Sequence, residues 1–141
     1  MKKHLFFVAC LAGATCLSAH PYIHKVWEYR PAPGQFVNTM PVAMEEDTPA
    51  TMAAKADSAI ANHKQEMISL GGYGGYVVFG FDHKILNIEG AYDFKILGNS
   101  FYANANPSQT TRRGGSSEPG IVMVSCDDNH NGLPDDTWYE L

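Results

Sequence analysis

The stretch Gly71-Gly72-Tyr73-Gly74-Gly75-Tyr76-Val77-Val78-Phe79-Gly80-Phe81-Asp82 marks the point where the chain turns from a helical to a β pattern. Its glycine cluster predicts a loop or a bulge. Residues 76–82 predict a strong strand, because they are rich in β-branched and aromatic side chains. The cluster is not a phosphate-binding loop, since no Lys-Ser/Thr follows it and a strand, not a helix, comes next.

Further strands are expected on the C-terminal side of this stretch. Residues 84–88 and 120–126 are apolar runs, and residues 92–97 alternate between apolar and polar side chains. Residues 103–117 are polar and loop-like. Short strands separated by turn signals predict a mostly β fold, an antiparallel β-sandwich.

Preceding the stretch, one helix is expected. Residues 20–47 predict an irregular segment with a candidate strand at 22–29. Thr48 followed by Pro49 is a helix start, and the helix should reach His63 or Glu66. Its apolar stripe should pack on the sheet, whereas Lys55, Asp57, Asn62 and Lys64 should face outward. The stripe consists of Met52, Ala56, Ala59, Ile60, His63 and Met67. Residues 48–141 would then form one domain, the helix plus a partial sandwich.

The first residues predict an export signal. Residues 1–19 combine the basic pair Lys2-Lys3, an apolar run and a small residue, Ala19, at the expected cleavage site. The run is shorter than the roughly 20 apolar residues of a membrane span. Lipid attachment at Cys16 is the alternative to simple secretion. Either route places the protein outside the cell or on the outer-membrane surface, with the periplasm less favoured.

The charge balance disfavours nucleic-acid binding. Ten Lys and Arg face fifteen Asp and Glu, for a net charge of −5. No basic stripe is available for a phosphate backbone. An acidic surface instead suits metal ions or neutral ligands.

Residues 127–136 contain the one motif that carries chemistry. Oxygen-bearing side chains alternate at Asp127, Asn129 and Asn131, and Gly132 follows, which matches the calcium-loop pattern D-x-[DN]-x-[DN]-G. Alternate side chains point to one side while the chain curls around a hard cation. The predicted ligands are Asp127, Asn129, Asn131, the Leu133 carbonyl, Asp135, Asp136 and Glu140.

This loop is not an EF-hand, because Trp138 stands where the bidentate Glu would be and no helices flank it. Asp136 or Glu140 would have to close the site. With few carboxylates, we expect a weak Ca²⁺ site, with a dissociation constant of roughly 10⁻⁴–10⁻³ M. An ordinary acidic Asn-Gly hairpin turn is the alternative.

The sequence gives little support to a zinc site or to a catalytic site. The histidines are too scattered for a zinc site. After cleavage Cys126 would be the one cysteine left, and its apolar strand predicts core packing, not nucleophilic catalysis. Asp82, Asp93 and Glu118 could supply hydrolase carboxylates, but nothing in their spacing selects them. We therefore expect no enzyme.

Several segments in order resemble secreted cell-surface proteins of Bacteroides-type bacteria, including PKD-domain-containing ones. The segments are residues 26–38, 71–83, 92–101, 118–124 and 127–141. The resemblance implies a jelly-roll of the galactose-binding type, outside the cell. It also implies proximity to outer-membrane uptake systems, such as those for cobalamin, and a longer family protein of which this chain would be the N-terminal part.

Two functions follow as hypotheses. The first is a non-catalytic, calcium-stabilised surface module that binds a glycan or another nutrient. Its ligand-binding aromatics would be Tyr73, Tyr76, Phe101, Tyr102 and Trp138. The alternative is an accessory component of an outer-membrane uptake complex, with a protein partner instead of a sugar.

Overall fold

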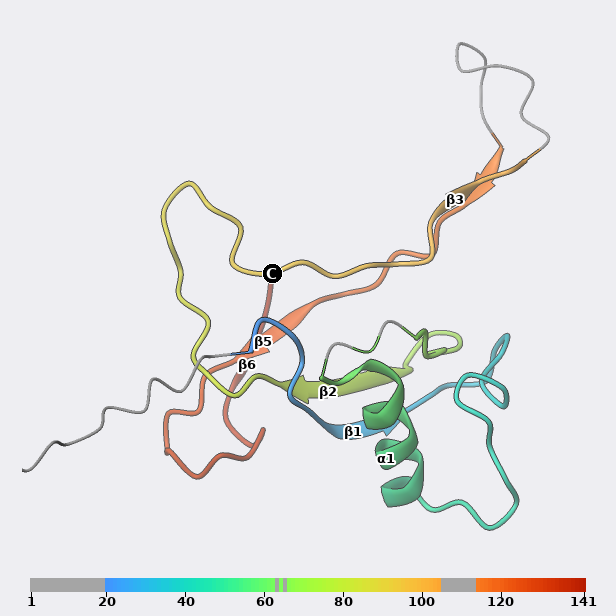
Figure 1. The fold of residues 1–141 in the computed structure, drawn as a ribbon, viewed down its shortest axis with the longest axis horizontal. Helices are drawn as coiled ribbons and strands as arrows, with labels where there is room; N and C mark the ends of the chain where they lie inside the picture. The colour runs from blue at the N-terminus through green and yellow to red at the C-terminus, as the bar shows by residue number, and fades with distance from the viewer. Residues whose placement is uncertain (1–19, 63, 65, 105–113) are drawn as a thin grey trace, which may run out of the picture.

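A computed structural model describes residues 20–62, 64, 66–104 and 114–141. The predicted signal segment 1–19 lies outside these residues. The elements, in chain order, are β1 (Lys25–Arg30), α1 (Pro49–Ile60), β2 (Tyr76–Gly80), β3 (Phe101–Tyr102), β4 (Gly115–Ser116), β5 (Met123–Ser125) and β6 (Trp138–Glu140). Figure 1 shows α1 beside β1 and β2, and the β3–β4 arm extending away from them.

Strands β1 and β2 form an antiparallel ribbon. Val26 pairs with Phe79 and Arg30 with Tyr76, and the register shifts between Val26 and Glu28. The extra residue at that bulge is Trp27, whose indole Nε1 lies close to Gly80. The strands predicted at 22–29 and 76–82 are therefore present, with somewhat different ends.

Helix α1 begins where the sequence predicts. The Thr48 side chain accepts a hydrogen bond from the Thr51 N–H, and the Thr51 hydroxyl accepts one from the Thr48 N–H. Pro49 occupies the first turn, where its missing N–H removes no helical hydrogen bond. The helix ends at Ile60, earlier than the predicted His63 or Glu66, and Ala61 already has extended backbone angles.

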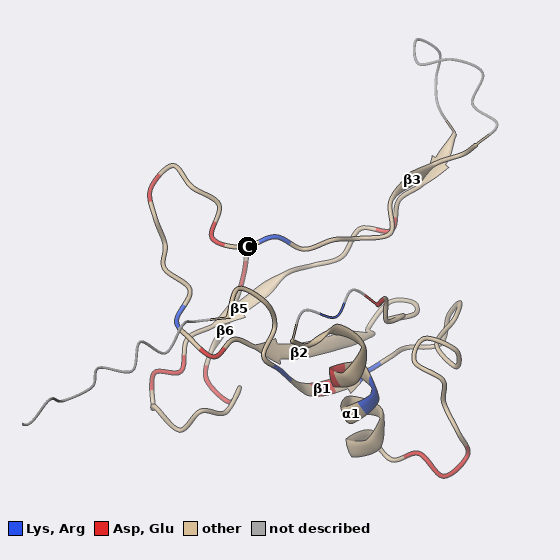
Figure 2. Ribbon diagram, in the orientation of Figure 1, with Lys and Arg blue, Asp and Glu red and all other residues tan. Residues whose placement is uncertain are grey.

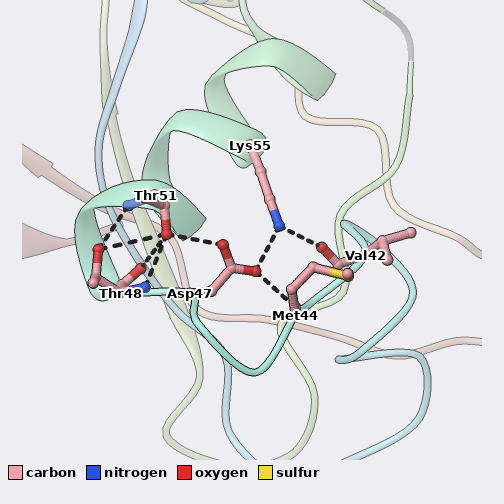
Figure 3. Close-up of polar contacts among 6 residues, drawn as sticks. All are labelled: Val42, Met44, Asp47, Thr48, Thr51 and Lys55. Carbon is pink, nitrogen blue, oxygen red and sulfur yellow. Dashed lines mark hydrogen bonds and ion pairs between the residues drawn. The ribbon is translucent and has the colours of Figure 1, made fainter.

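A salt bridge fastens the segment before α1 to the helix (Figure 3). The Lys55 ammonium contacts the Asp47 carboxylate and also donates to the Val42 carbonyl. The same carboxylate accepts the Met44 N–H at 2.7 Å and the Thr51 hydroxyl at 2.9 Å. These three donors lower the pKa of Asp47, with the Lys55 hydrogen bond as the largest cause.

The core lies between α1 and the ribbon. Val26 and Tyr29 of β1 pack with Ala53 and Ala56 of α1, and Val77 and Phe79 of β2 lie against this cluster. Small alanines on the helix let it approach the strand closely. The Tyr29 hydroxyl donates to the Ser69 carbonyl at 2.6 Å, so its polar end is satisfied although the side chain is buried.

The prediction that Asp57 faces outward is wrong. Its carboxylate accepts the backbone N–H of Val26 at 2.7 Å. The bond joins α1 to β1 beside the bulge, where the regular ladder leaves backbone groups without strand partners. Amphipathic periodicity misassigned this residue because it treats every carboxylate as a solvent-facing group.

The expected β-sandwich, jelly-roll or otherwise, is wrong for the described residues. They form three separate two-stranded antiparallel sheets, β1–β2, β3–β4 and β5–β6. Contacts between elements join only β1 with β2, α1 with β1, β3 with β4 and β5 with β6 in this part of the chain. The predicted single helix packed on a sheet is present, but the sheet is a ribbon.

Two predicted strands are absent from their expected places. Residues 84–88 and 92–97 have no strand pairing and are mostly exposed. Their apolar side chains satisfy the local strand pattern, but a strand also needs a neighbour for its backbone groups and a face on which to bury its side chains. The described part of the chain supplies neither for these two segments.

Candidate metal-binding loop and aromatic residues

The candidate calcium loop connects β5 to β6. Ser125 pairs with Trp138, and residues 126–137 form the connection between them. The strand predicted at 120–126 is shortened to Met123–Ser125. A hairpin therefore holds both ends of the loop, which fixes the separation of its donor groups.

The first half of the loop curls around the Asp127 carboxylate. Its two oxygens accept the backbone N–H groups of Asn131 and Gly132, each at 3.0 Å. The Asn131 amide oxygen accepts the Leu133 N–H at 2.7 Å in the same way. Gly132 has a φ of +72°, a left-handed conformation that a side chain would disfavour. The sharp turn at Gly132 is the part of this geometry that the D-x-N-x-N-G pattern predicts.

The second half of the loop folds back on the first. The Asn129 amide nitrogen donates to Asp135 at 3.2 Å and to Asp136 at 3.3 Å. The Asn131 amide nitrogen donates to both oxygens of Asp135, at 3.2 and 3.0 Å. The Asn131 hydrogen bonds, followed by that of Asn129, lower the pKa of Asp135. One oxygen of Asp136, Oδ2, is buried and has no hydrogen-bond partner.

These residues fit a hard cation in donor type. Asp135, Asp136 and the two asparagine side chains converge, and the unpartnered Asp136 oxygen is an acceptor without a donor. The asparagines point nitrogen at the carboxylates, so a cation would require each amide to turn its oxygen inward. Among the described residues, no three His, Cys, Asp or Glu side chains form a group that could hold a metal ion.

The predicted ligands Leu133 and Glu140 lie in different positions relative to the loop. Leu133 lies within the loop, so its carbonyl stays a predicted ligand. Glu140 lies on β6 opposite Met123, at the end of the hairpin away from the loop. That position leaves Asp136 as the better placed of the two carboxylates proposed to close the site.

The loop is strongly acidic. The four carboxylates of Asp127, Asp128, Asp135 and Asp136 lie on it, and the chain has no Lys or Arg from Gly114 to Leu141. Figure 2 shows this hairpin loop with acidic segments and no basic one. Like charges at such spacing repel one another, which a bound cation or solvent ions must screen.

The prediction that Cys126 packs in the core is wrong, because its side chain is exposed. A hydrogen bond with Asp128 is the largest cause of a raised Cys126 pKa, and the negative charges of Asp128 and Asp127 add to it. Lys84 offsets part of the rise. A thiol in acidic surroundings is a poor nucleophile, since the thiolate is the reactive form.

The five predicted ligand-binding aromatics lie on separate parts of the chain: the β1–β2 ribbon with the turn before it, the β3–β4 hairpin and the β5–β6 hairpin. Tyr73 lies in the turn before β2 and is fully exposed, and Tyr76 begins β2 beside Glu28. Phe101 and Tyr102 form β3, and Trp138 begins β6. The β3–β4 and β5–β6 hairpins contact neither each other nor the ribbon through their strands.

Two features were missed by the sequence reasoning. One is an open groove of about 1050 Å³ between α1 and the preceding loop, lined among others by Met40, Met44, Lys55 and Met67. The other is a polar contact between the first described residue and the end of β2. Neither has a local sequence signal, because each joins segments that are distant in the chain.

The polar contact at the end of β2 is formed around the Asp82 carboxylate. The His83 ring nitrogen Nδ1 lies 2.7 Å from one oxygen, and the His20 backbone N–H donates at 3.3 Å to both oxygens. The His83 hydrogen bond is the largest cause of the lowered Asp82 pKa, and His24 is close enough to contribute.

Comparisons with known proteins found no family model that matches the chain and no curated protein that is similar to it. No helix among the residues that the structure describes has the length and apolar character needed to cross a membrane.

Proposed function

We propose that the chain is an exported, non-catalytic binding protein of the bacterial cell surface whose β5–β6 loop holds Ca²⁺. The observation that carries the proposal is the buried, unpartnered Oδ2 of Asp136 among the loop's converging side chains. Asp127, Asp135 and Asp136 would supply carboxylate oxygens, and Asn129 and Asn131 would supply amide oxygens once each amide turns. Calcium accepts such mixed carboxylate, amide and carbonyl sets, with affinities in the extracellular range for few carboxylates.

A bound cation would stabilise the β5–β6 hairpin and not the core between α1 and the β1–β2 ribbon. The strands β5 and β6 contact only each other among the described elements. Calcium that binds only the folded loop lowers the free energy of that local state by RT ln(1 + [L]/Kd). At 1 mM Ca²⁺ and a Kd of about 0.1 mM this is about 1.4 kcal/mol, roughly a tenfold smaller open population.

Amide hydrogen exchange of the loop tests the calcium site. The N–H groups of Asn131, Gly132 and Leu133 donate to loop side chains and so report on its closure. Their exchange should slow roughly tenfold in 1 mM Ca²⁺. Mg²⁺ should do much less, because it demands near-ideal octahedral geometry and dehydrates reluctantly.

Two neighbouring aspartates supply matched variants. Asp127→Asn removes a ligand charge, and it should abolish the slowing. Asp128→Asn makes the same chemical change at a residue outside the donor set, and it should retain most of it. Unchanged exchange in several millimolar Ca²⁺ would show that the loop is an ordinary acidic turn.

Export has its own test. The basic pair, apolar run and small residue of segment 1–19 support cleavage after Ala19. Mass spectrometry of the exported protein should find a chain that starts at His20. A lipidated start at Cys16 would correct the cleavage site but keep export, and an intact Met1 in the cytosol would refute both.

The chemical class of the ligand distinguishes a module that binds a glycan or nutrient from an accessory component that binds a protein. A glycan or small nutrient would use the predicted aromatic residues, of which Tyr73 and Tyr76 are near neighbours. A protein partner, in an accessory role at an outer-membrane uptake complex, is favoured by the ribbon itself. Each strand of β1–β2 has an outer edge with which no other described strand pairs, and such edges can accept a strand from another chain. Hits on a glycan array support the sugar, whereas a silent array with retained receptor binding supports the protein partner.

A further inference from the structure

The backbone nitrogen of His20 lies against a carboxylate that is distant in the sequence. Its N–H donates to both oxygens of Asp82, each at 3.3 Å. The backbone N–H of His24 donates to the Gly80 carbonyl at 2.8 Å, which extends the β1–β2 pairing toward this contact. The residue after the predicted cleavage site is thus held beside the end of β2.

Cleavage changes the chemistry of that nitrogen. Hydrolysis of the Ala19–His20 amide adds one water, leaves a carboxylate on Ala19 and leaves an amine on His20, which takes up a proton. A neutral N–H donor becomes an ammonium with three donors. Ammonium-to-carboxylate hydrogen bonds are shorter and stronger than those between an amide and a carboxylate.

We propose that Asp82 is the binding site for the chain's own processed amino terminus, and that removal of the leader fastens residue 20 to the end of β2. The ligand class is a primary ammonium. The inference rests on the proposed export for its start at His20. Among the described residues, the imidazoles of His83 and His24 also interact with Asp82, and the His20 N–H reaches both carboxylate oxygens in their presence.

A double-mutant cycle measures the interaction between the positive charge of the amino terminus and the Asp82 carboxylate. The chain 20–141 is prepared with a free or an acetylated amino terminus, and each form with Asp82 or with Asp82→Asn. Acetylation restores a neutral amide N–H, so the two forms differ in charge and not in the presence of a donor. The readout is amide exchange at His24, whose N–H closes the ribbon next to Asp82.

The free terminus should slow exchange at His24 roughly two- to fivefold relative to the acetylated form, as exposed ion pairs do. Asp82→Asn should remove that difference, and 1 M salt should reduce it. Glu89→Gln, a matched loss of an exposed carboxylate, should keep it. An equal difference in Asp82→Asn would overturn the proposal.

A second variant guards against a structural effect of Asp82→Asn. A chain that keeps Ala19 has the same ammonium about 3.8 Å further along the backbone and an intact Asp82. It should behave like the acetylated form, and protection equal to that of the His20 start would also overturn the proposal. Failure of export is distinguishable, because it appears in the mass of the secreted chain and not in this exchange.

Discussion

Two tyrosines show how differently the two halves of this chain are used. Tyr29 on β1 is 1% exposed, whereas Tyr92 is fully exposed. All buried apolar side chains of the described residues lie before residue 81: Val26, Tyr29, Ala53, Ala56, Ala59 and Ala61. Among the described residues, the packed region (20–62, 64 and 66–80) and the extended region (81–104 and 114–141) both contain large apolar side chains, and they differ in the partners available to bury them. Apolar content alone does not make a core.

The packed region has a core because a helix packs on a ribbon of two strands that are distant in the sequence. Helix α1 lies against β1 with Ala53 and Ala56, and β1 pairs with β2 from beyond the glycine cluster. The Asp57 carboxylate and the Tyr29 hydroxyl add polar bonds across the same cluster. In the described part of the extended region, no helix is available to supply such a second layer.

The largest expected effect distinguishes these two tyrosines. Tyr29→Ala should cost about 3–5 kcal/mol of unfolding free energy, because it empties a buried site. Tyr92→Ala should stay within about 0.5 kcal/mol, as exposed substitutions do. Denaturant titration followed by circular dichroism measures both. Equal costs would contradict the division into a packed and an extended region.

A smaller effect sharpens the comparison within α1 itself. Ala56 is fully buried against β1, and Ala54 on the same helix is exposed. Ala56→Leu should lose about 1–3 kcal/mol through overpacking, whereas Ala54→Leu should be close to neutral. The same denaturant titration tests the pair. A neutral Ala56→Leu would mean that the helix does not sit closely on β1.

The smallest effect concerns acid stability of the packed region. The pKa of Asp47 is lowered in the folded state, chiefly by Lys55 and then by the Met44 N–H. A lowered folded-state pKa stabilises the fold above the ordinary aspartate range, and the gain is lost as pH falls below about 4. Asp47→Asn should therefore reduce stability at pH 7 and flatten its decline in acid. Glu45→Gln, which removes one carboxylate at an exposed neighbour, is the matched control for the loss of charge.

Local signals predicted local structure well. Thr48-Pro49 predicted the start of α1, and residues 76–82 predicted β2, because capping and strand composition act over a few residues. Residues 84–88 and 92–97 also carry strand patterns, but they form no strand in the structure. A strand forms only where the fold places another strand beside it, and the periodicity of a short segment does not predict that neighbour.

The candidate site shows the same limit. The D-x-N-x-N-G pattern predicted a sharp turn at Gly132 and a chain that curls around a cation; the structure has the turn, and the chain curls around the Asp127 carboxylate. It did not predict that the asparagine amides would turn nitrogen toward Asp135 and Asp136. Nor could it predict the contact between His20 and Asp82, which no motif links.

Residue-resolved hydrogen exchange of the chain 20–141 tests the division most directly. Amides in β1, α1 and β2 should exchange slowly, because opening them requires loss of the shared core. Amides of residues 84–97 should exchange at nearly unprotected rates, with or without calcium. Strong, uniform protection across residues 84–97 would reveal a packed sheet there and contradict the account.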